Sequence, residues 1–197
     1  MDWTVKPGEH WIVIGPNGSG KTSLLRLLSG VYPPTTGQVT LEGQDLANYS
    51  RKILARRLAA VQQQTETAFD YTVLEIVLMG RYPHLRNFEI EGPLDLELAT
   101  QALAATGTSD LTARAFSTLS GGEKQRVLIA GALAQLSSTD PSVIESNILL
   151  LDEPTTSLDL NYQLEIGSLL QNLNGTGITM VISTHDLNLA ASVCRCM

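Results

Sequence analysis

One short segment near the start of the chain constrains its fold more than any other feature. Residues 15–22 read Gly-Pro-Asn-Gly-Ser-Gly-Lys-Thr and fit the pattern G-x-x-x-x-G-K-[ST], between an apolar strand predicted at Trp11–Ile14 and a helix that opens near Gly20. The glycines let backbone N–H groups turn inward around a phosphate, and the helix adds the positive end of its dipole. The alternative is an ordinary glycine-rich turn, which the strand–loop–helix context disfavours. The segment therefore predicts a phosphate-binding loop.

The side chains of this loop indicate which ligands to expect. Lys21 can reach the β- and γ-phosphates of a nucleoside triphosphate, and the Thr22 hydroxyl can ligate Mg²⁺. We therefore expect the chain to bind ATP together with Mg²⁺. The predicted nucleotide-binding residues of the loop are Gly15, Pro16, Asn17, Gly18, Ser19, Gly20, Lys21, Thr22 and Ser23.

A second motif places two carboxylates at the end of an apolar strand. Ile148–Leu151 is wholly apolar, as expected for a parallel strand covered on both faces, and Asp152 and Glu153 follow it directly. Such a strand delivers its last residues to the sheet edge where a phosphate loop lies. We predict that Asp152 binds Mg²⁺, directly or through water, and that Glu153 orients the attacking water. The alternative is a strand that ends in two solvated acids.

A third motif, Leu119-Ser120-Gly121-Gly122-Glu123, opens a predicted helix. Ser120 suits the N-cap position, and the two glycines leave the first N–H groups of the helix bare, which predicts a second anion site. Ser120 and Glu123 also fit a capping box, so simple helix capping is the alternative.

The predicted elements alternate between strands and helices at both ends of the chain, around a helical middle. This order indicates an α/β core with an inserted helical lobe. The predicted strands are Trp3–Val5, Trp11–Ile14, Gln38–Leu41, Ile148–Leu151 and Ile178–Ile182. The predicted helices run from Gly20 to Gly30, over Thr72–Met79, Leu94–Ala105, Gly121–Leu136 and Leu160–Leu173, and onward from Asp186.

Composition and charge restrict the partners. The chain of 197 residues carries 20 acidic and 13 basic residues, a net charge of -7, which argues against non-specific binding to nucleic acid or an anionic membrane surface. No apolar run has the length of a membrane helix, and the first residues do not resemble a signal peptide. A cytosolic protein is therefore expected. Cys194 and Cys196 form a C-x-C pair that could bind metal, but free thiols on a frayed tail are the favoured interpretation.

Taken together, these motifs resemble the ATP-binding subunit of an ABC transporter, and the resemblance covers nearly the whole chain. Residues 15–22 match the Walker A motif of that family, residues 119–123 its signature sequence and residues 148–153 its Walker B motif. The signature separates this family from kinases and GTPases that also have a phosphate loop. Further matches are the D-loop at Ser157-Leu158-Asp159, the switch histidine His185 and the Q-loop glutamine Gln63, whose neighbours Gln62 and Gln64 leave that assignment open by one position.

The resemblance implies a fold, a site and an assembly. The fold would be a P-loop NTPase (RecA-like) α/β core with a parallel sheet, an antiparallel β portion near the N-terminus and an inserted helical lobe. One domain would span residues 1–197, with residues 1–65 and 137–197 as the core and residues 66–136 as the lobe. Two copies would pair head to tail, so that the signature of each copy caps the ATP bound by the other.

The family also implies roles for single residues. His185 and Gln63 would act with Glu153 in catalysis, His185 at the γ-phosphate and Gln63 at Mg²⁺ and the attacking water. Asp159 would act across the dimer interface. Ser120, Gly121 and Gly122 would contact the ATP of the partner copy.

Several segments look like those of importers of iron–siderophore, haem or cobalamin. They are residues 80–85, 158–160 and 185–190, together with the long loop 137–147. This likeness implies membrane permease subunits as partners and a peripheral position on the inner face of the cell membrane, without insertion into it. The alternatives are a soluble ABC ATPase without a transporter and a nucleotide-binding fragment without turnover.

The chain departs from the family pattern at both ends. No aromatic residue precedes the phosphate loop at the distance expected for stacking on adenine, since Trp3 and Trp11 read as packing residues. The chain also ends just after the switch histidine, where relatives continue with further strands. It therefore looks truncated at both ends, and we expect the absence of these strands to leave an exposed sheet edge after Ile178–Ile182.

Overall fold

A four-stranded parallel sheet forms the centre of the molecule. The computed structural model describes residues 2–62, 70–138, 147–156 and 158–193. Within these ranges the strands run in the spatial order β1-β6-β5-β4, with bounds His10–Ile14, Thr179–Thr184, Ile148–Asp152 and Leu58–Val61. Every neighbouring pair in this sheet is parallel. The carboxyl ends of the strands therefore meet at one edge, where Ile14 pairs with Thr184 and Asp152 with Ser183.

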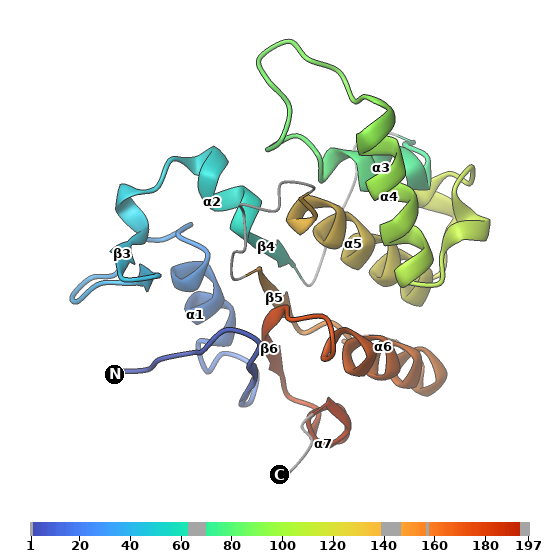
Figure 1. Cartoon of the computed structure of the whole chain (residues 1–197). Coiled ribbons are helices and arrows are strands. Elements are labelled where there is room, and N and C mark those ends of the chain that lie inside the picture. Colours follow the sequence, from blue (N-terminus) through green and yellow to red (C-terminus); the bar gives the residue numbers. More distant parts are fainter. Residues whose placement is uncertain (1, 63–69, 139–146, 157, 194–197) are drawn as a thin grey trace.

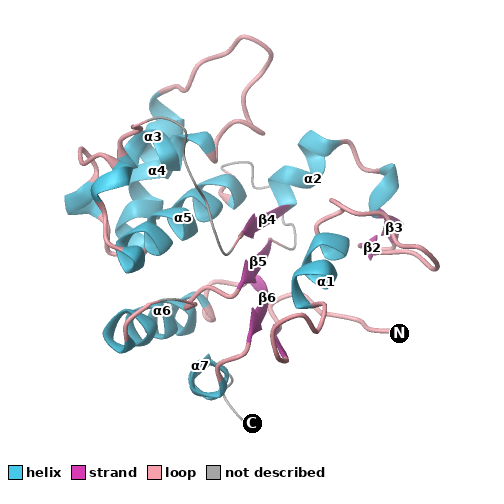
Figure 2. Ribbon diagram, turned by 180° about the vertical axis from the view of Figure 1, so that it is seen from behind, coloured by secondary structure: helices cyan, strands magenta, loops and turns pink. Residues whose placement is uncertain are grey.

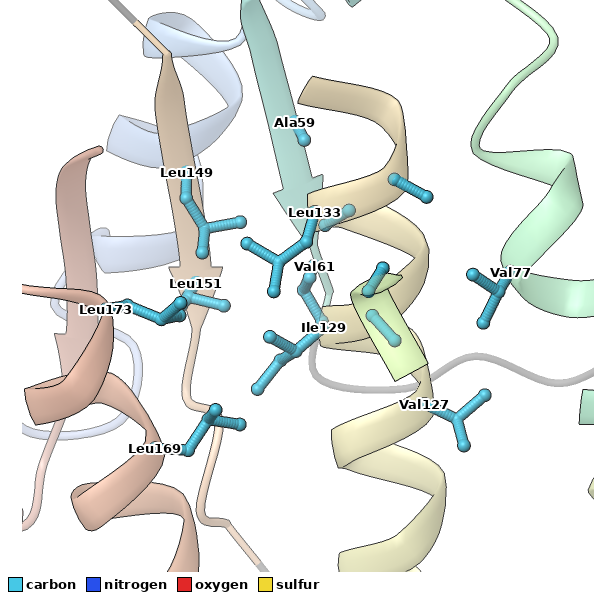
Figure 3. Close-up of a cluster of buried hydrophobic side chains, with 14 of the residues drawn as sticks. Ala59, Val61, Val77, Val127, Ile129, Leu133, Leu149, Leu151, Leu169 and Leu173 are labelled. Carbon is cyan, nitrogen blue, oxygen red and sulfur yellow. The ribbon is translucent and has the colours of Figure 1, made fainter. Parts of the chain in front are cut away.

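The two faces of the sheet carry separate hydrophobic clusters because successive strand residues point to opposite sides. Leu150 and Val181 belong to a cluster with Leu25 of α1 (Lys21–Leu28) and Leu54 of α2 (Arg51–Arg57). The side chains of Leu149, Leu151, Met180 and Ile182 point the other way, into the larger cluster with α5 (Gly121–Leu136) and α6 (Leu160–Leu173). Figure 3 shows Leu149 and Leu151 of β5 facing Ile129 and Leu133 of α5 and Leu169 and Leu173 of α6.

Three helices gather beside the sheet. They are α3 (Val73–Met79), α4 (Pro93–Ala105) and α5, and all three pack on one another (Figure 1). Helix α5 also packs against β4 and joins this group to the sheet. A short antiparallel pair of strands, β2 (Thr40–Leu41) and β3 (Gln44–Asp45), lies next to α1 (Figure 2). In that figure the pair and the three helices are on opposite sides of the sheet. The remaining elements are the 3₁₀ turns Leu46–Asn48, Ser109–Leu111 and Phe116–Thr118 and the final helix α7 (Leu187–Val193).

The expected fold class is confirmed, because a parallel sheet, an antiparallel pair and a helical group are all present. The boundaries of core and lobe stay a prediction. Within the described residues no helix is both long and apolar enough to cross a membrane.

Three details of the expected fold are wrong. Residues 3–5 form no strand, although Trp3 packs edge-on against Trp11 with ring centroids 5.3 Å apart. Helix α2 and strand β4 were not predicted, because Arg51–Val61 is too short and too mixed in polarity to show either period clearly. The strand near Ile178 is not an edge, since β6 lies between β1 and β5.

Candidate nucleotide site

The phosphate loop connects β1 to α1 and has the backbone conformation that its glycines predict. Gly18 and Gly20 have φ angles of +78° and +96°, a region that favours glycine. At Gly15 an added Cβ would lie 2.7 Å from the Ser19 hydroxyl. Gly20 is the N-cap of α1 and offers no side chain to the first N–H groups of the helix. These donors therefore face the end of the loop without a side-chain cap, as an anion site requires.

Lys21 folds back over its own loop. Its Nζ donates to the carbonyls of Gly15 at 2.7 Å and Pro16 at 3.0 Å, and it forms an ion pair with Glu153 Oε1 at 3.1 Å. The Lys21 side chain is 5% exposed and that of Glu153 is 9% exposed. The cation that would bind phosphate is therefore neutralised by the carboxylate that would orient water.

Glu153 is held in an unusual backbone conformation. Its φ of +49° lies in the left-handed region, which is costly for a residue with a side chain. Its N–H donates to both the carbonyl oxygen of Ser183, at 3.0 Å, and the Ser183 hydroxyl, at 3.1 Å. Its Oε2 accepts a hydrogen bond from Thr156 at 2.7 Å and lies 3.2 Å from His185 Nδ1. The bonds to Ser183 hold the backbone of Glu153, and the contacts with Thr156 and His185 hold its carboxylate.

The environment keeps Glu153 ionised. Burial raises the pKa of this carboxyl, but the hydrogen bonds from Thr156 and Lys21 and the positive charge of Lys21 outweigh burial and bring the pKa below its ordinary value. Glu153 is therefore a carboxylate at neutral pH, the form that accepts a hydrogen bond from water.

Asp152 and Thr22 provide oxygen ligands suited to Mg²⁺. Both residues line one cavity of about 320 Å³, and Gln62 lines the same cavity. Ser183 donates to Asp152 Oδ1 at 2.5 Å and so orients this carboxylate. At a phosphate site Mg²⁺ takes few protein ligands, and phosphates and waters complete its coordination shell. The Thr22 hydroxyl and the Asp152 carboxylate are suited to be these protein ligands. The predicted metal ligand Gln63 lies outside the described residues.

His185 contacts Glu153 Oε2, the carboxylate oxygen that Lys21 does not contact, whereas Asp159 lies at the start of α6. His185 follows β6, has a half-exposed side chain and lines a second cavity with Thr155, Thr156 and Gln163. Asp159 is the exposed N-cap residue of α6, but its side chain makes no capping hydrogen bond. Of the remaining D-loop residues Leu158 is described, whereas Ser157 lies outside the described residues, as do the cysteines at 194 and 196.

The signature segment lies at the start of α5. Ser120 caps α5, accepting from the Glu123 N–H at 3.3 Å while its own N–H donates to Glu123 Oε2 at 2.7 Å. The capping box considered as the alternative is thus present. Among the described residues no hydrogen bond or ion pair joins residues 119–123 to residues 15–23. The chain does not bring its own signature to its own phosphate loop.

The structure adds residues that the sequence motifs did not reveal. Ser183 and Thr156 orient the two Walker B carboxylates, and Tyr162 packs on Gly122. Serine or threonine beside a motif is too common to single out. Only the pairing of strands β5 and β6 places the Ser183 hydroxyl against Asp152.

The importer-like segment at residues 80–85 has a packing role. Arg81 is 3% exposed, forms an ion pair with Asp95 at 2.9 Å and donates to the carbonyls of Ala134 and Ser137 at the end of α5. His84 contacts the carbonyl of Gln135 at 2.7 Å. The segment ends α3 and also caps α5.

Comparisons with known proteins show which family the chain resembles. A family model described as ABC transporter matches residues 1–156. The chain is 45% identical over 185 residues to the hemin import ATP-binding protein HmuV of Gloeobacter violaceus, covering 94% of the chain and 66% of that protein. It is 42% identical over 187 residues to the ferric enterobactin transport ATP-binding protein FepC of Escherichia coli, with the same two coverages. It is 40% identical to the cobalamin import ATP-binding protein BtuD of Halobacterium salinarum, of which it covers 46%.

Solved structures show the same fold. An inward-facing ABC transporter described as of metal-chelate type matches with a TM-score of 0.83 and 34% identity, over 98% of this chain and 70% of that one. A dimeric bacterial ABC transporter cassette matches with a TM-score of 0.77 and 29% identity, over 96% of this chain and 80% of that one. The chain spans about two thirds or less of the length of the curated relatives that it matches.

Proposed function

Because the chain belongs to the ABC transporter family of ATPases, we propose that it binds and hydrolyses ATP with Mg²⁺ and drives the import of a metal chelate. The observation that carries this proposal is the meeting of Lys21, Glu153 and His185 at the carboxyl edge of the sheet, beside the bare N-terminus of α1. A phosphate ligand, a water-orienting carboxylate and a γ-phosphate contact are the groups that phosphoryl transfer to water requires.

The site would work by positioning and charge stabilisation. The loop N–H groups and Lys21 would hold the phosphates of ATP, which requires Lys21 to leave Glu153. Glu153 would then be free to accept a hydrogen bond from a water placed in line with the γ-phosphate, while Thr156 holds its carboxylate and Ser183 holds its backbone. Thr22 and Asp152 would hold Mg²⁺, which when bound supplies positive charge that stabilises the developing negative charge on the phosphates. His185 would contact the γ-phosphate.

The transported solute is proposed from the relatives. The curated relatives named above are ATP-binding proteins of hemin import, ferric enterobactin transport and cobalamin import, and the similar solved transporter is described as of metal-chelate type. We therefore expect iron–siderophore, haem or cobalamin as the solute, permease subunits as partners and a cytoplasmic, peripheral place on the membrane. Closure and reopening of the dimer formed by the cores, residues 1–65 and 137–197, would move the permease subunits docked on the helical lobe, residues 66–136.

Hydrolysis by the purified chain tests the enzymatic part of this proposal. We expect phosphate release from ATP in the presence of Mg²⁺ and none when EDTA removes the metal, because Asp152 and Thr22 cannot replace the cation's charge. A Mg²⁺-dependent rate no higher than that of the Glu153→Gln protein would overturn the proposed activity.

The head-to-tail assembly predicts an effect of the signature on the other copy's site. Ser120→Arg should stop hydrolysis while ATP binding stays within a few fold, because bulk and charge at the N-terminus of α5 would block closure against the partner. Mixing this variant with Lys21→Ala should restore some activity, since a mixed dimer has one site with both lesions and one with neither. Hydrolysis and nucleotide titration measure both effects.

A matched control separates this effect from the loss of a helix cap. Thr72 caps α3 with the same capping box, through Glu75, that Ser120 forms with Glu123. Thr72→Arg removes an equivalent cap, worth about 1 kcal/mol, without touching the signature. If Thr72→Arg stops hydrolysis equally, or if Ser120→Arg abolishes ATP binding to the monomer, the assignment of the signature to the partner's site is wrong.

A further inference from the structure

Gly122 lies directly under an aromatic ring of another helix. A Cβ added to Gly122 would lie 2.5 Å from Cγ and 2.9 Å from Cβ of Tyr162, a residue of α6. The ring atom Cδ1 of Tyr162 is also in this overlap, and Cβ lies at the base of the side chain, where rotation of the ring cannot move it away. Any residue larger than glycine at position 122 must therefore push α5 and α6 apart.

Two further contacts extend this one along the same helix pair. Leu158 lies just before α6, and its Cδ2 would be 3.0 Å from a Cβ added to Gly121. One and a half turns into the two helices, Arg126 of α5 forms an ion pair with Glu165 of α6 at 2.9 Å. Tyr162 and Glu165 are three residues apart and share one face of α6, and Leu158 precedes the helix. The three residues form a row, here called the α6 row, that lies along the first turns of α5.

The α6 row connects two elements that the proposed function assigns to the partner copy's site. Helix α5 begins with the signature, where Ser120 is the N-cap. Helix α6 begins at the exposed Asp159, three residues before Tyr162. The N-termini of both helices are thus tied together by packing within one chain.

We propose that the α6 row makes the signature and Asp159 one rigid surface, with Tyr162 as the positioning residue that sets where the signature meets the partner's ATP. This inference rests on the proposed head-to-tail ATPase. In this arrangement position 122 must be glycine because a side chain there would collide with the Tyr162 ring. This requirement is separate from any contact between the Gly122 N–H group and nucleotide.

A double-mutant cycle in the full chain tests the packing. Gly122→Ala should lower Tm by roughly 2 to 10 °C, because overpacking outweighs the gain in helix propensity that alanine brings. In a Tyr162→Ala background the ring is absent, so the same Gly122→Ala change should leave Tm unchanged or raise it. Gly175→Ala is the matched control, because no atom lies within 4 Å of the added Cβ there. An equal loss of Tm in both backgrounds would overturn the packing role.

Kinetics test whether Tyr162 positions the signature. Tyr162→Ala should lower kcat about tenfold or more while the Kd for ATP stays within about twofold, since the chain's own phosphate loop is untouched. Tyr162→Phe keeps the ring and should restore kcat. Leu164→Ala changes an exposed residue of the same helix and should leave kcat unchanged. A normal kcat in Tyr162→Ala would overturn the positioning role. If the wild-type chain does not hydrolyse ATP, the proposed function is contradicted. The Tm measurements would then still show whether Tyr162 packs on Gly122.

Discussion

Glu153→Gln should lower ATP hydrolysis by roughly two orders of magnitude or more, as expected when the group that polarises water loses its charge. The amide has nearly the size of the carboxylate, and its oxygen can still accept the hydrogen bond from Thr156. The ion pair with Lys21 is lost, however, so phosphate no longer competes with a carboxylate for this cation. We therefore expect the affinity for ATP to stay the same or rise, and an ATP-bound dimer to accumulate.

Single-turnover hydrolysis, equilibrium nucleotide binding and size-exclusion chromatography with ATP measure these three effects. Glu97→Gln is a matched control, because Glu97 lies on the outer surface of α4 and bonds only to Gln101 among the described residues. Hydrolysis near the parent rate in Glu153→Gln would move the water-orienting role to another group, and His185 would be the next candidate. Weaker ATP binding would contradict the view that Glu153 competes with phosphate for Lys21.

The sequence was sufficient where a motif is local. The phosphate loop depends on positive φ angles within six residues, so its glycines predict its shape directly. The apolar run before Asp152 likewise predicts a buried strand, and β5 is buried on both faces. In both cases the residues that determine the structure are neighbours in the chain.

The sequence was insufficient where a contact depends on how elements are placed. The spatial order β1-β6-β5-β4 cannot be read from the order of strands in the chain, which is why β6 was expected at an edge. The bond between Ser183 and Asp152 spans 31 residues and forms only because β5 and β6 pair in one register. The same is true of Tyr162 and Gly122, whose contact depends on the packing of α5 against α6. A sequence motif identifies the functional residue, but the packing of elements distant in the sequence determines which other side chains orient that residue.

The pairing of Lys21 with Glu153 illustrates this limit and gives the second large prediction. Lys21→Ala should weaken ATP binding by roughly two orders of magnitude or more, because charge-assisted hydrogen bonds to phosphate are lost in a site with few other side-chain donors. The variant should also lose about 1 to 3 kcal/mol of stability, since Glu153 would remain buried as a carboxylate without its cation. Titration with ATP and Mg²⁺ and thermal or urea unfolding measure the two effects.

These two effects of Lys21→Ala can be separated by a second substitution. In the double variant Lys21→Ala with Glu153→Gln, the buried position 153 carries no charge, so stability should recover most of the loss while ATP binding stays weak. Lys6→Ala removes a lysine from the exposed turn before β1 and should change neither quantity. If ATP binding recovers together with stability, the single variant failed through misfolding of the site, and Lys21 does not hold the phosphates. If neither recovers, the ion pair with Glu153 is not what makes the loss of Lys21 destabilising.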